Sequence, residues 1–459
     1  MSALPKYDHY KASDVEWLGD VPSHWEVRSL RGILKERGET NEGTKTDFIL
    51  SVMKDRGVIP YTEKGNVGNK MSEDITTYKL VCPGDLVINK MNAIIGSLGI
   101  SEYHGALSKV YFVMQPRYEY LNNRFYGYLF QIRDFQKSLC KISYGIMELR
   151  ESINFNEFKN LPLPLPPKPE QDRIVAFLDQ KTAEIDALIA KKQRQIELLD
   201  EQKAILINRA VTRGIVNEEF GMRNEHISSS SHSTFTTHHS KFSPSGIEWI
   251  GDIPEHWEAS QIKHLGNIVS GYAFPSTEFT ENTADCRVVK IANIQTMRMD
   301  WADASYISNR YLKQLPQFRV GKGDLLFALT RPIIKAGIKA AIVEAEWPML
   351  LNQRNAVFHP SRKINLEWLY YIIVNPEFVA HFDTLIDKTG QQPNISPVDI
   401  GNIVVPLPPK EERLRICQYL TDAQIRFSEV VQKIEAHIES LKILRSTLIA
   451  HAVTGRIKV

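Results

Sequence analysis

The longest regular pattern of apolar residues in the chain predicts an extended helix. Between Glu170 and Thr212 there is no Gly or Pro, and apolar residues recur at steps of three, four or seven, which places them on one helical stripe. At about 1.5 Å per residue, a helix over this segment would be about 65 Å long. The stripe consists of Ile174, Leu178, Ile185, Ile189, Ile196, Leu199, Leu206 and Ala210.

A second stripe of the same form lies 242 residues further along the chain, where every equivalent position from Ile416 to Ala452 is again apolar. A single stripe is normally explained by a helix that lies on the core of its own domain. Two stripes of equal and unusual length favour an antiparallel coiled coil between the two helices. The residues expected to form this pairing are Leu178, Ile185, Ile196, Leu199, Leu206, Leu420, Phe427, Ile438, Leu441 and Leu448.

The segments that precede the two helices have a different pattern. Short runs of β-branched and aromatic residues occur there, bounded by Gly, Asp and Asn, and such runs are typical of strands. The clearest are residues 85–89, 109–114, 324–328 and 355–359. With shorter helices between them, these strands predict an α+β domain in each half of the chain.

The two halves are copies of one another. Glu16 to Glu26 reads EWLGDVPSHWE and Glu248 to Glu258 reads EWIGDIPEHWE, so 8 of 11 residues are identical. The segments that begin at Pro164 and Pro406 share 9 of 15 residues and both contain Leu-Pro-Pro-Lys, a natural start for a helix. We therefore expect an internal pseudo-twofold duplication.

The repeats divide the chain into seven parts. We expect a Trp-rich segment and a mixed α+β segment before each long helix, with a flexible Ser-, Thr- and His-rich linker between the halves. Four linker histidines (His226, His232, His238 and His239) could bind metal, but the Ser-rich tract favours a plain linker, and we predict no metal site. The parts are residues 1–26, 27–167, 168–214, 215–247 (linker), 248–258, 259–409 and 410–459.

Composition narrows the class of protein. With 43% hydrophobic and 24% charged residues the chain is an ordinary globular protein, and its net charge of +2 gives no global field for nucleic acid. The four cysteines have no metal or disulfide spacing, and no apolar stretch approaches the roughly 20 residues that span a bilayer. We expect a cytoplasmic protein without a membrane partner.

Sequence motifs of catalysis are missing. The chain contains no phosphate-binding Gly-rich motif, no metalloprotease or hydrolase motif and no base-flipping tetrapeptide. Asp85 and Asp324 recur in a Gly-Asp-Leu pattern, but a Gly-Asp pair at the start of a strand is typical of a turn. We therefore predict a chain that is not an enzyme and binds no cofactor of its own.

Local positive strips remain as candidate binding surfaces. Residues 86–118 contain three cationic residues and one acidic residue. Residues 325–341 contain three cationic residues, Arg331, Lys335 and Lys339, and no acidic residue. Nearby amides supply donors and acceptors for base edges, although charge alone would equally fit a solvated surface. The DNA-binding candidates are Lys90, Asn92, Lys109, Arg331, Lys335, Gln353, Arg354, Gln391 and Gln392.

The repeated Trp-rich motif, the Pro-Leu-Pro-Pro that closes each mixed segment and the duplicated long helices resemble the specificity subunit of type I restriction-modification enzymes. The resemblance implies that each mixed segment is a target-recognition domain that reads one half of a split DNA sequence. It also implies that the coiled coil sets the spacing and docks two methyltransferase subunits. Restriction subunits would join the complex, and S-adenosylmethionine, ATP and magnesium would be used by these partners.

The resemblance places Thr389 to Ser396 in a small polar loop of the second recognition domain, whereas the first half reads differently at Ser143 to Arg150. Because the loops of the two halves differ, an asymmetric bipartite target is expected. Two alternatives are a coiled-coil adaptor that binds protein or another ligand and a self-contained DNA-modifying enzyme with diverged motifs. Salt-dependent DNA binding would distinguish a DNA-binding subunit from the adaptor, which need not show it. Binding of S-adenosylmethionine by the isolated chain would favour the self-contained enzyme.

Overall fold

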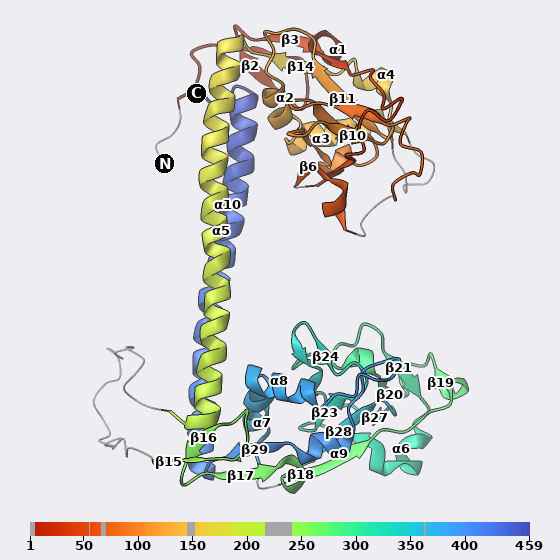
Figure 1. The fold of residues 1–459 in the computed structure, drawn as a ribbon, viewed down its shortest axis with the longest axis vertical. Coiled ribbons are helices and arrows are strands. Elements are labelled where there is room, and N and C mark those ends of the chain that lie inside the picture. Colours follow the sequence, from red (N-terminus) through yellow and green to blue (C-terminus); the bar gives the residue numbers. More distant parts are fainter. Residues whose placement is uncertain (1–4, 55, 66–69, 145–151, 216–240, 362–363) are drawn as a thin grey trace. The chain divides into compact units, whose positions relative to one another are not determined.

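The computed structural model describes residues 5–54, 56–65, 70–144, 152–215, 241–361 and 364–459. Backbone contacts divide the chain into two compact units. Unit 1 comprises Met1–Arg194 and Ile434–Val459, and unit 2 comprises Gln195–Lys433 (Figure 1). Most of the predicted linker, with its four histidines, lies outside the described residues.

The two long helices predicted from periodicity are present. Helix α5 spans Lys168–Arg213 and helix α10 spans Lys410–Val453. Gly214 and Gly455 follow their ends with φ of 80° and 75°, the left-handed conformation that terminates many helices. The predicted second helical segment extends to residue 459, but the last six residues are not helical.

Unit 1 is built around a four-stranded antiparallel sheet in the order β4-β11-β8-β9. The strand pairs β1-β2, β3-β14, β5-β6, β7-β10 and β12-β13 complete its β structure. The strands of the main sheet are β4 (Leu34–Glu36), β11 (Tyr111–Pro116), β8 (Leu86–Asn89) and β9 (Leu98–Ile100). The paired strands are β1 (Tyr10–Ala12), β2 (Asp20–Pro22), β3 (Glu26–Ser29), β14 (Pro162–Leu165), β5 (Leu50–Met53), β6 (Gly57–Pro60), β7 (Lys79–Val81), β10 (Gly105–Leu107), β12 (Ser143–Tyr144) and β13 (Ser152–Ile153). The short helices are α1 (Leu30–Ile33), α2 (Asn123–Leu129), α3 (Arg133–Ser138) and α4 (Phe155–Phe158).

Unit 2 repeats this frame with a sheet in the order β18-β28-β23-β26 and adds a five-stranded sheet in the order β19-β21-β20-β27-β22. In the added sheet, β20 and β27 are parallel. The first sheet contains β18 (Gly266–Ser270), β28 (Asn355–Pro360), β23 (Leu325–Ala328) and β26 (Ala340–Ile342). The second contains β19 (Phe279–Thr280), β21 (Ser305–Ile307), β20 (Cys286–Val289), β27 (Met349–Leu351) and β22 (Arg319–Val320). The other strands form three pairs: β15 (Phe242–Pro244) with β16 (Asp252–Pro254), β17 (Glu258–Gln261) with β29 (Val404–Leu407), and β24 (Ile333–Ile334) with β25 (Gly337–Ile338). The short α-helices are α6 (Arg310–Gln314), α7 (Leu366–Ile373), α8 (Pro376–Thr384) and α9 (Pro397–Asn402).

The mixed helix and strand content and the duplication predicted from the sequence are confirmed. All four clearest apolar runs form strands, namely β8, β11, β23 and β28. The Gly-Asp pairs form turns as predicted, since Asp85 accepts from the Cys82 amide at 2.8 Å and Asp324 accepts from the Gly321 amide at 2.8 Å. Asp85 also forms an ion pair at 2.7 Å with Arg37, which follows β4, and Asp324 contacts His359 of β28 at 2.8 Å.

Within each unit, apolar residues of the long helices pack both on the core of the domain and against the other long helix. In unit 1, Leu178 and Ile185 of α5 share one core with Leu448 of α10 and with domain residues such as Phe125. In unit 2, Leu206 of α5 shares a core with Leu420 of α10 and with Trp368. The start of α5 therefore meets the end of α10 in unit 1, and the end of α5 meets the start of α10 in unit 2.

The remaining predicted pairing residues lie at different depths. Ile438 is buried, whereas Ile196, Leu199, Phe427 and Leu441 are half-buried. An ion pair between Arg445 and Asp186 at 3.0 Å joins the two helices within unit 1. These contacts leave the pairing of the full stripes a prediction.

The Trp-rich segments fasten the starts of the long helices. His24 contacts the Glu170 carboxylate at 2.8 Å, and the equivalent His256 contacts Glu412 at 2.8 Å. In unit 1 the same segment also closes on the end of α10, where a Cβ at Gly455 would lie 2.4 Å from Pro22. The repeated motif thus has a structural role in each unit.

Candidate nucleic-acid interface

Three loops of unit 2 meet at the end of β23. The Leu329 amide donates to the Arg354 carbonyl at 2.9 Å, and the Ile395 amide donates to the Leu329 carbonyl at 2.9 Å. The Arg331 amide donates to the Pro393 carbonyl at 2.8 Å. The turn before β28, the segment after β23 and the polar loop at residues 387–395 are therefore neighbours.

This arrangement brings together the DNA-binding candidates of the second half. Arg331, Gln353, Arg354 and Gln391 are exposed on these loops, and Gln392 is half-buried. Lys335 is exposed at the tip of the β24-β25 hairpin, which follows Arg331 directly. These neighbouring loops thus carry cationic and amide side chains, and we call these six residues the loop surface of unit 2.

Arg331 is held in an uncommon backbone conformation. Its φ is 49°, in the left-handed region that favours Gly. This turn is fixed by the hydrogen bond from the Arg331 amide to the Pro393 carbonyl and by the one that Thr330 Oγ1 donates to Asn394 Oδ1 at 2.6 Å. Uncommon conformations of this kind persist only where surrounding contacts hold them, and they are often found at functional sites.

Unit 1 repeats the same backbone connections. The Lys90 amide donates to the Val110 carbonyl at 3.3 Å, and the Ile153 amide donates to the Lys90 carbonyl at 3.0 Å. Lys90 is half-buried, whereas Asn92 and Lys109 are exposed on the adjoining loops. The candidates of the first half therefore also lie at one edge of the sheet, and we call Lys90, Asn92 and Lys109 the loop surface of unit 1.

The same bonds bear on the loops at Thr389 to Ser396 and Ser143 to Arg150, which differ in sequence. Ile153 and Ile395 make the same backbone bond, and a short helix follows each of them. The segments after the loops are thus equivalent in the fold. Residues 145–151, which contain most of the first loop, lie outside the described residues.

A groove of about 370 Å³ in unit 1 was missed by the sequence reasoning. Its described lining includes Lys54, Lys64 and Lys70 but no Asp or Glu, together with the candidate Asn92. The three lysines come from a part of the chain with several acidic residues, so their charge did not stand out along the sequence. The groove gathers these lysines beside Asn92 and so extends the candidate surface of unit 1.

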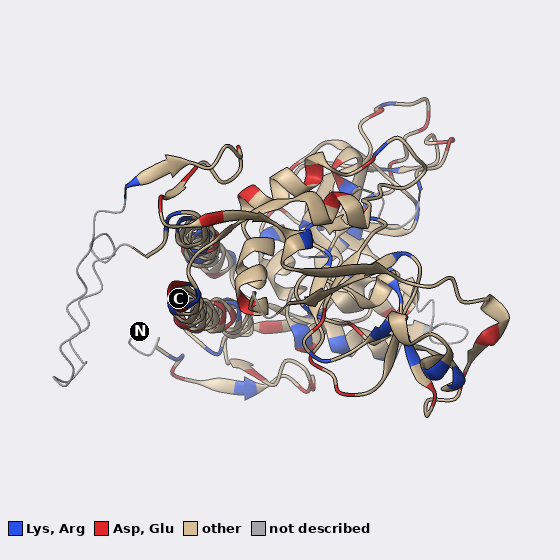
Figure 2. Cartoon of the chain, turned by 90° about the horizontal axis from the view of Figure 1, so that it is seen from below, with Lys and Arg blue, Asp and Glu red and all other residues tan. Residues whose placement is uncertain are grey.

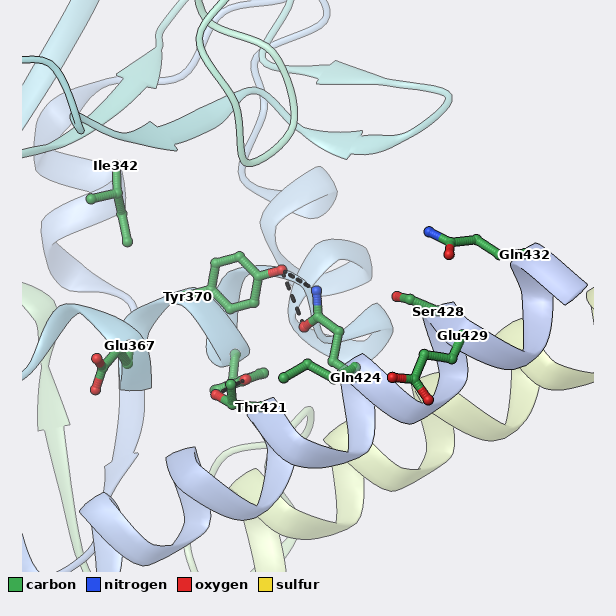
Figure 3. Close-up of a pocket in the computed structure, with 10 residues that line it drawn as sticks. Ile342, Glu367, Tyr370, Thr421, Gln424, Ser428, Glu429 and Gln432 are labelled. Atoms are coloured by element: carbon green, nitrogen blue, oxygen red, sulfur yellow. Dashed lines mark hydrogen bonds between the residues drawn. The ribbon is translucent and has the colours of Figure 1, made fainter.

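Neither positive nor negative charge dominates the chain as a whole. Figure 2 shows Lys and Arg interspersed with Asp and Glu over the ribbon. A hollow of about 490 Å³ between α7 and α10 in unit 2 is lined by Glu367 and Glu429 and by no Lys or Arg (Figure 3). Tyr370 and Gln424 hydrogen-bond across it at 3.2 Å. Its charge is unsuited to DNA phosphates, so the loop surfaces are the better candidates.

The metal-binding side chains and the buried thiols of the described residues bear on the chemistry open to the chain. They include no group of three His, Cys, Asp or Glu side chains that could hold a metal ion. Burial raises the pKa of the Cys286 thiol to about 12 and that of Cys417 to about 11, so neither is a ready nucleophile. Among the helices in these parts of the chain, none has the length and apolar character required to cross a membrane.

Two units with the same sheet and different loops at its edge define a duplicated recognition scaffold. The family of this scaffold is shown by comparison with known sequences. A family model described as the type I restriction modification DNA specificity domain matches residues 22–198 and again residues 254–440. The chain therefore belongs to the type I restriction-modification specificity family, as its resemblance had indicated.

Individual relatives agree with this assignment. The chain is 27% identical over 446 residues to the type I restriction enzyme MjaVIII specificity subunit of Methanocaldococcus jannaschii, covering 96% of this chain and 94% of the relative. It is 29% identical to the EcoAI specificity subunit of Escherichia coli over 167 residues, covering 36% of this chain and 28% of the relative.

Solved structures share the fold. A chain from a study of complex assembly and conformational transition in the type I R-M system matches with a TM-score of 0.66 and 16% identity, covering 94% of this chain and 98% of that one. The HsdS subunit from Thermoanaerobacter tengcongensis matches with a TM-score of 0.50 and 16% identity, covering 95% of this chain and 98% of that one.

Proposed function

We propose that this chain is the DNA target-recognition subunit of a type I restriction-modification enzyme. The observation that carries the proposal is the double match to the DNA specificity domain, once in each half of the chain. Each match contains one copy of the four-stranded sheet and its loop surface. A shared frame with variable loops is how a recognition surface is diversified without loss of the fold.

The two loop surfaces read different DNA sequences in this proposal. At equivalent positions after β8 and β23 the chain has Lys90 and Asn92 in one half and Leu329 and Arg331 in the other. Amide and guanidinium groups form different hydrogen bonds with base edges, and Arg prefers guanine. The target is therefore an asymmetric sequence of two half-sites separated by an unread gap, with residues 27–167 and 259–409 as the two recognition domains.

Helices α5 and α10 form the antiparallel coiled coil of the proposal and set the gap. The chain itself is not catalytic and binds no cofactor. Two methyltransferase subunits that use S-adenosylmethionine bind to it, and restriction subunits that use ATP and magnesium join them, all in the cytoplasm with the host DNA. The nine DNA-binding candidates named from the sequence are the proposed contacts.

Methylome sequencing of a host that carries this chain with its partner methyltransferase tests the function. We expect one methylated motif that is asymmetric and bipartite and that disappears when the gene for this chain is deleted. Purified complex should bind DNA with an affinity that falls with salt, because bound phosphates release counterions. Salt-independent binding and an unchanged methylome would instead support an adaptor for protein ligands.

Exposed apolar side chains on α5 and α10 are the proposed docking surface for the methyltransferase subunits. Large apolar side chains exposed on a helix are candidates for contact with a partner subunit. They are Leu188, Leu198 and Ile205 on α5, and Leu414, Ile425, Val430 and Ile443 on α10.

Ile443→Asp should weaken methyltransferase binding at least about 10-fold, because a buried apolar contact is replaced by a charge that must be desolvated. Ile443 is 58% exposed in this chain, so its thermal unfolding should not change. Ser446→Asp adds the same charge at an exposed polar position of the same helix and should bind normally. Pull-down and calorimetry with purified subunits measure both variants, and normal binding by Ile443→Asp contradicts this docking surface.

A further inference from the structure

Lys339 is a buried cation at the base of the β24-β25 hairpin. Its amide donates to the Pro332 carbonyl at 2.7 Å, and its own carbonyl accepts from Ala328 at 2.9 Å. This backbone pairing places it next to Arg331 on the loop surface of unit 2. Only 7% of Lys339 is exposed, although lysine is among the residues least often buried.

The ammonium group of Lys339 has little compensation for its burial. Its Nζ donates to the Ile291 carbonyl at 2.6 Å, and no carboxylate among the described residues forms an ion pair with it. Burial lowers the pKa of Lys339, and the neighbouring positive charge of Arg331 lowers it further. The folded protein without a bound ligand therefore disfavours the charged form of Lys339.

The equivalent residue of unit 1 shows that this charge is not needed by the fold. The Asn89 amide donates to the Ser97 carbonyl at 3.0 Å, which matches the bond from Ala328 to Lys339. Ser97 is also buried, and its hydroxyl donates to the Val52 carbonyl at 3.1 Å. A neutral hydroxyl thus satisfies a backbone carbonyl at this position, so the charge of Lys339 calls for another explanation.

We propose that Lys339 binds a backbone phosphate of the DNA target, beside the base that Arg331 contacts. The inference rests on the DNA-recognition function proposed above. A phosphate would supply the missing negative charge for two adjacent cations, and an ammonium is a good point-charge ligand for it. Phosphate contacts position a protein on DNA, so Lys339 fixes the register in which Arg331 reads its base.

The test uses the complex of this chain with its partner methyltransferase and duplex DNA with or without the methylated motif. Lys339→Gln removes the charge and keeps a donor for the Ile291 carbonyl. We expect affinity for both duplexes to fall about 5- to 10-fold. The slope of log affinity against log salt should become less steep by about 0.9, the value for one phosphate. The methylated motif should stay the same, whereas Arg331→Ala should relax one position of it.

Two controls separate this role from a structural one. Lys313→Gln makes the same charge change at an exposed position of α6 and should leave affinity and slope unchanged. Lys339→Met, a neutral residue suited to a buried site, should repeat the binding defect without lowering the unfolding temperature. If both neutral Lys339 variants bind with the wild-type salt slope, or only lose thermal stability, the proposal is wrong.

Neutral methylphosphonate linkages, placed one at a time along the duplex, identify the phosphate. At one position the wild-type complex should lose affinity while Lys339→Gln loses nothing further. Equal losses for both proteins at every position would overturn the phosphate contact. If the wild-type complex itself shows no salt-dependent DNA binding, the proposed function fails and not merely the role of Lys339.

Discussion

Replacing residues 27–167 with the corresponding segment of another family member should change one half of the methylated motif completely and leave the other half intact. The loops of each half are fixed by contacts inside their own unit. In unit 1, the backbone bonds of Lys90 to Val110 and Ile153 close the loop surface without any residue of the other recognition domain. The donor loops would therefore bring their own reading surface.

The exchange also has a packing requirement. The core of unit 1 includes Ile174 and Leu178 of α5 and Val453 of α10, which the exchanged segment must cover. A donor that keeps residues equivalent to Phe125 and Leu163 should fold, since volume-conserving apolar changes in a core are tolerated best. Circular dichroism and thermal unfolding identify donors that satisfy this condition.

Methylome sequencing reads the result, and the reciprocal exchange of residues 259–409 is the matched control. That exchange should alter only the other half-site, so the two experiments assign each half-site to its domain. A motif in which both halves change after one exchange would contradict independent reading. A continuous or palindromic motif in the parent would contradict it as well.

The sequence was sufficient for the long helices because their signal is local and periodic. A repeated stripe and a Pro-rich start each act within a few residues. The strands β8, β11, β23 and β28 were predictable for the same reason, as were the turns at Asp85 and Asp324. The duplication followed from direct identity between the halves.

The candidate site was predictable only in part, because charges and loops combine through the fold. The cationic groove of unit 1 collects Lys54, Lys64 and Lys70 from positions with acidic neighbours in sequence. The parallel pair β20 and β27 joins segments about 60 residues apart, and no local period encodes such a pairing. The contact of His24 with Glu170 could have been suspected, because both residues recur in the second half as His256 and Glu412.

The burial of Lys339 was beyond sequence reasoning altogether. In sequence it is one of three cations in a positive strip, and charge alone fits a solvated surface as well as a binding surface. Only the fold shows that Lys339 is 7% exposed and that its Nζ donates to the Ile291 carbonyl. Its equivalence to Ser97 likewise depends on strand register, which identity between the halves does not give at that position.

Lengthening both long helices by four residues should abolish methylation at the original sites and create new sites whose gap is one or two base pairs longer. Four residues add about 6 Å to a helix, and base pairs are about 3.4 Å apart. Each insertion would stand where the helix passes from one unit to the other, between Arg194 and Gln195 in α5 and between Lys433 and Ile434 in α10. The half-sites themselves should be unchanged, because neither loop surface is touched.

The number four is chosen for its effect on the apolar stripe. A step of four is one of the steps by which the stripe itself advances, so the inserted turn keeps later apolar positions close to their original side of the helix. Insertion in α5 alone is the control, because it shifts one stripe against the other and should lower stability and complex assembly.

Methylome sequencing of the double insertion decides the role of the helices. An unchanged gap would show that something other than α5 and α10 sets the spacing, whereas a longer gap with the same half-sites would make these helices the ruler of the target.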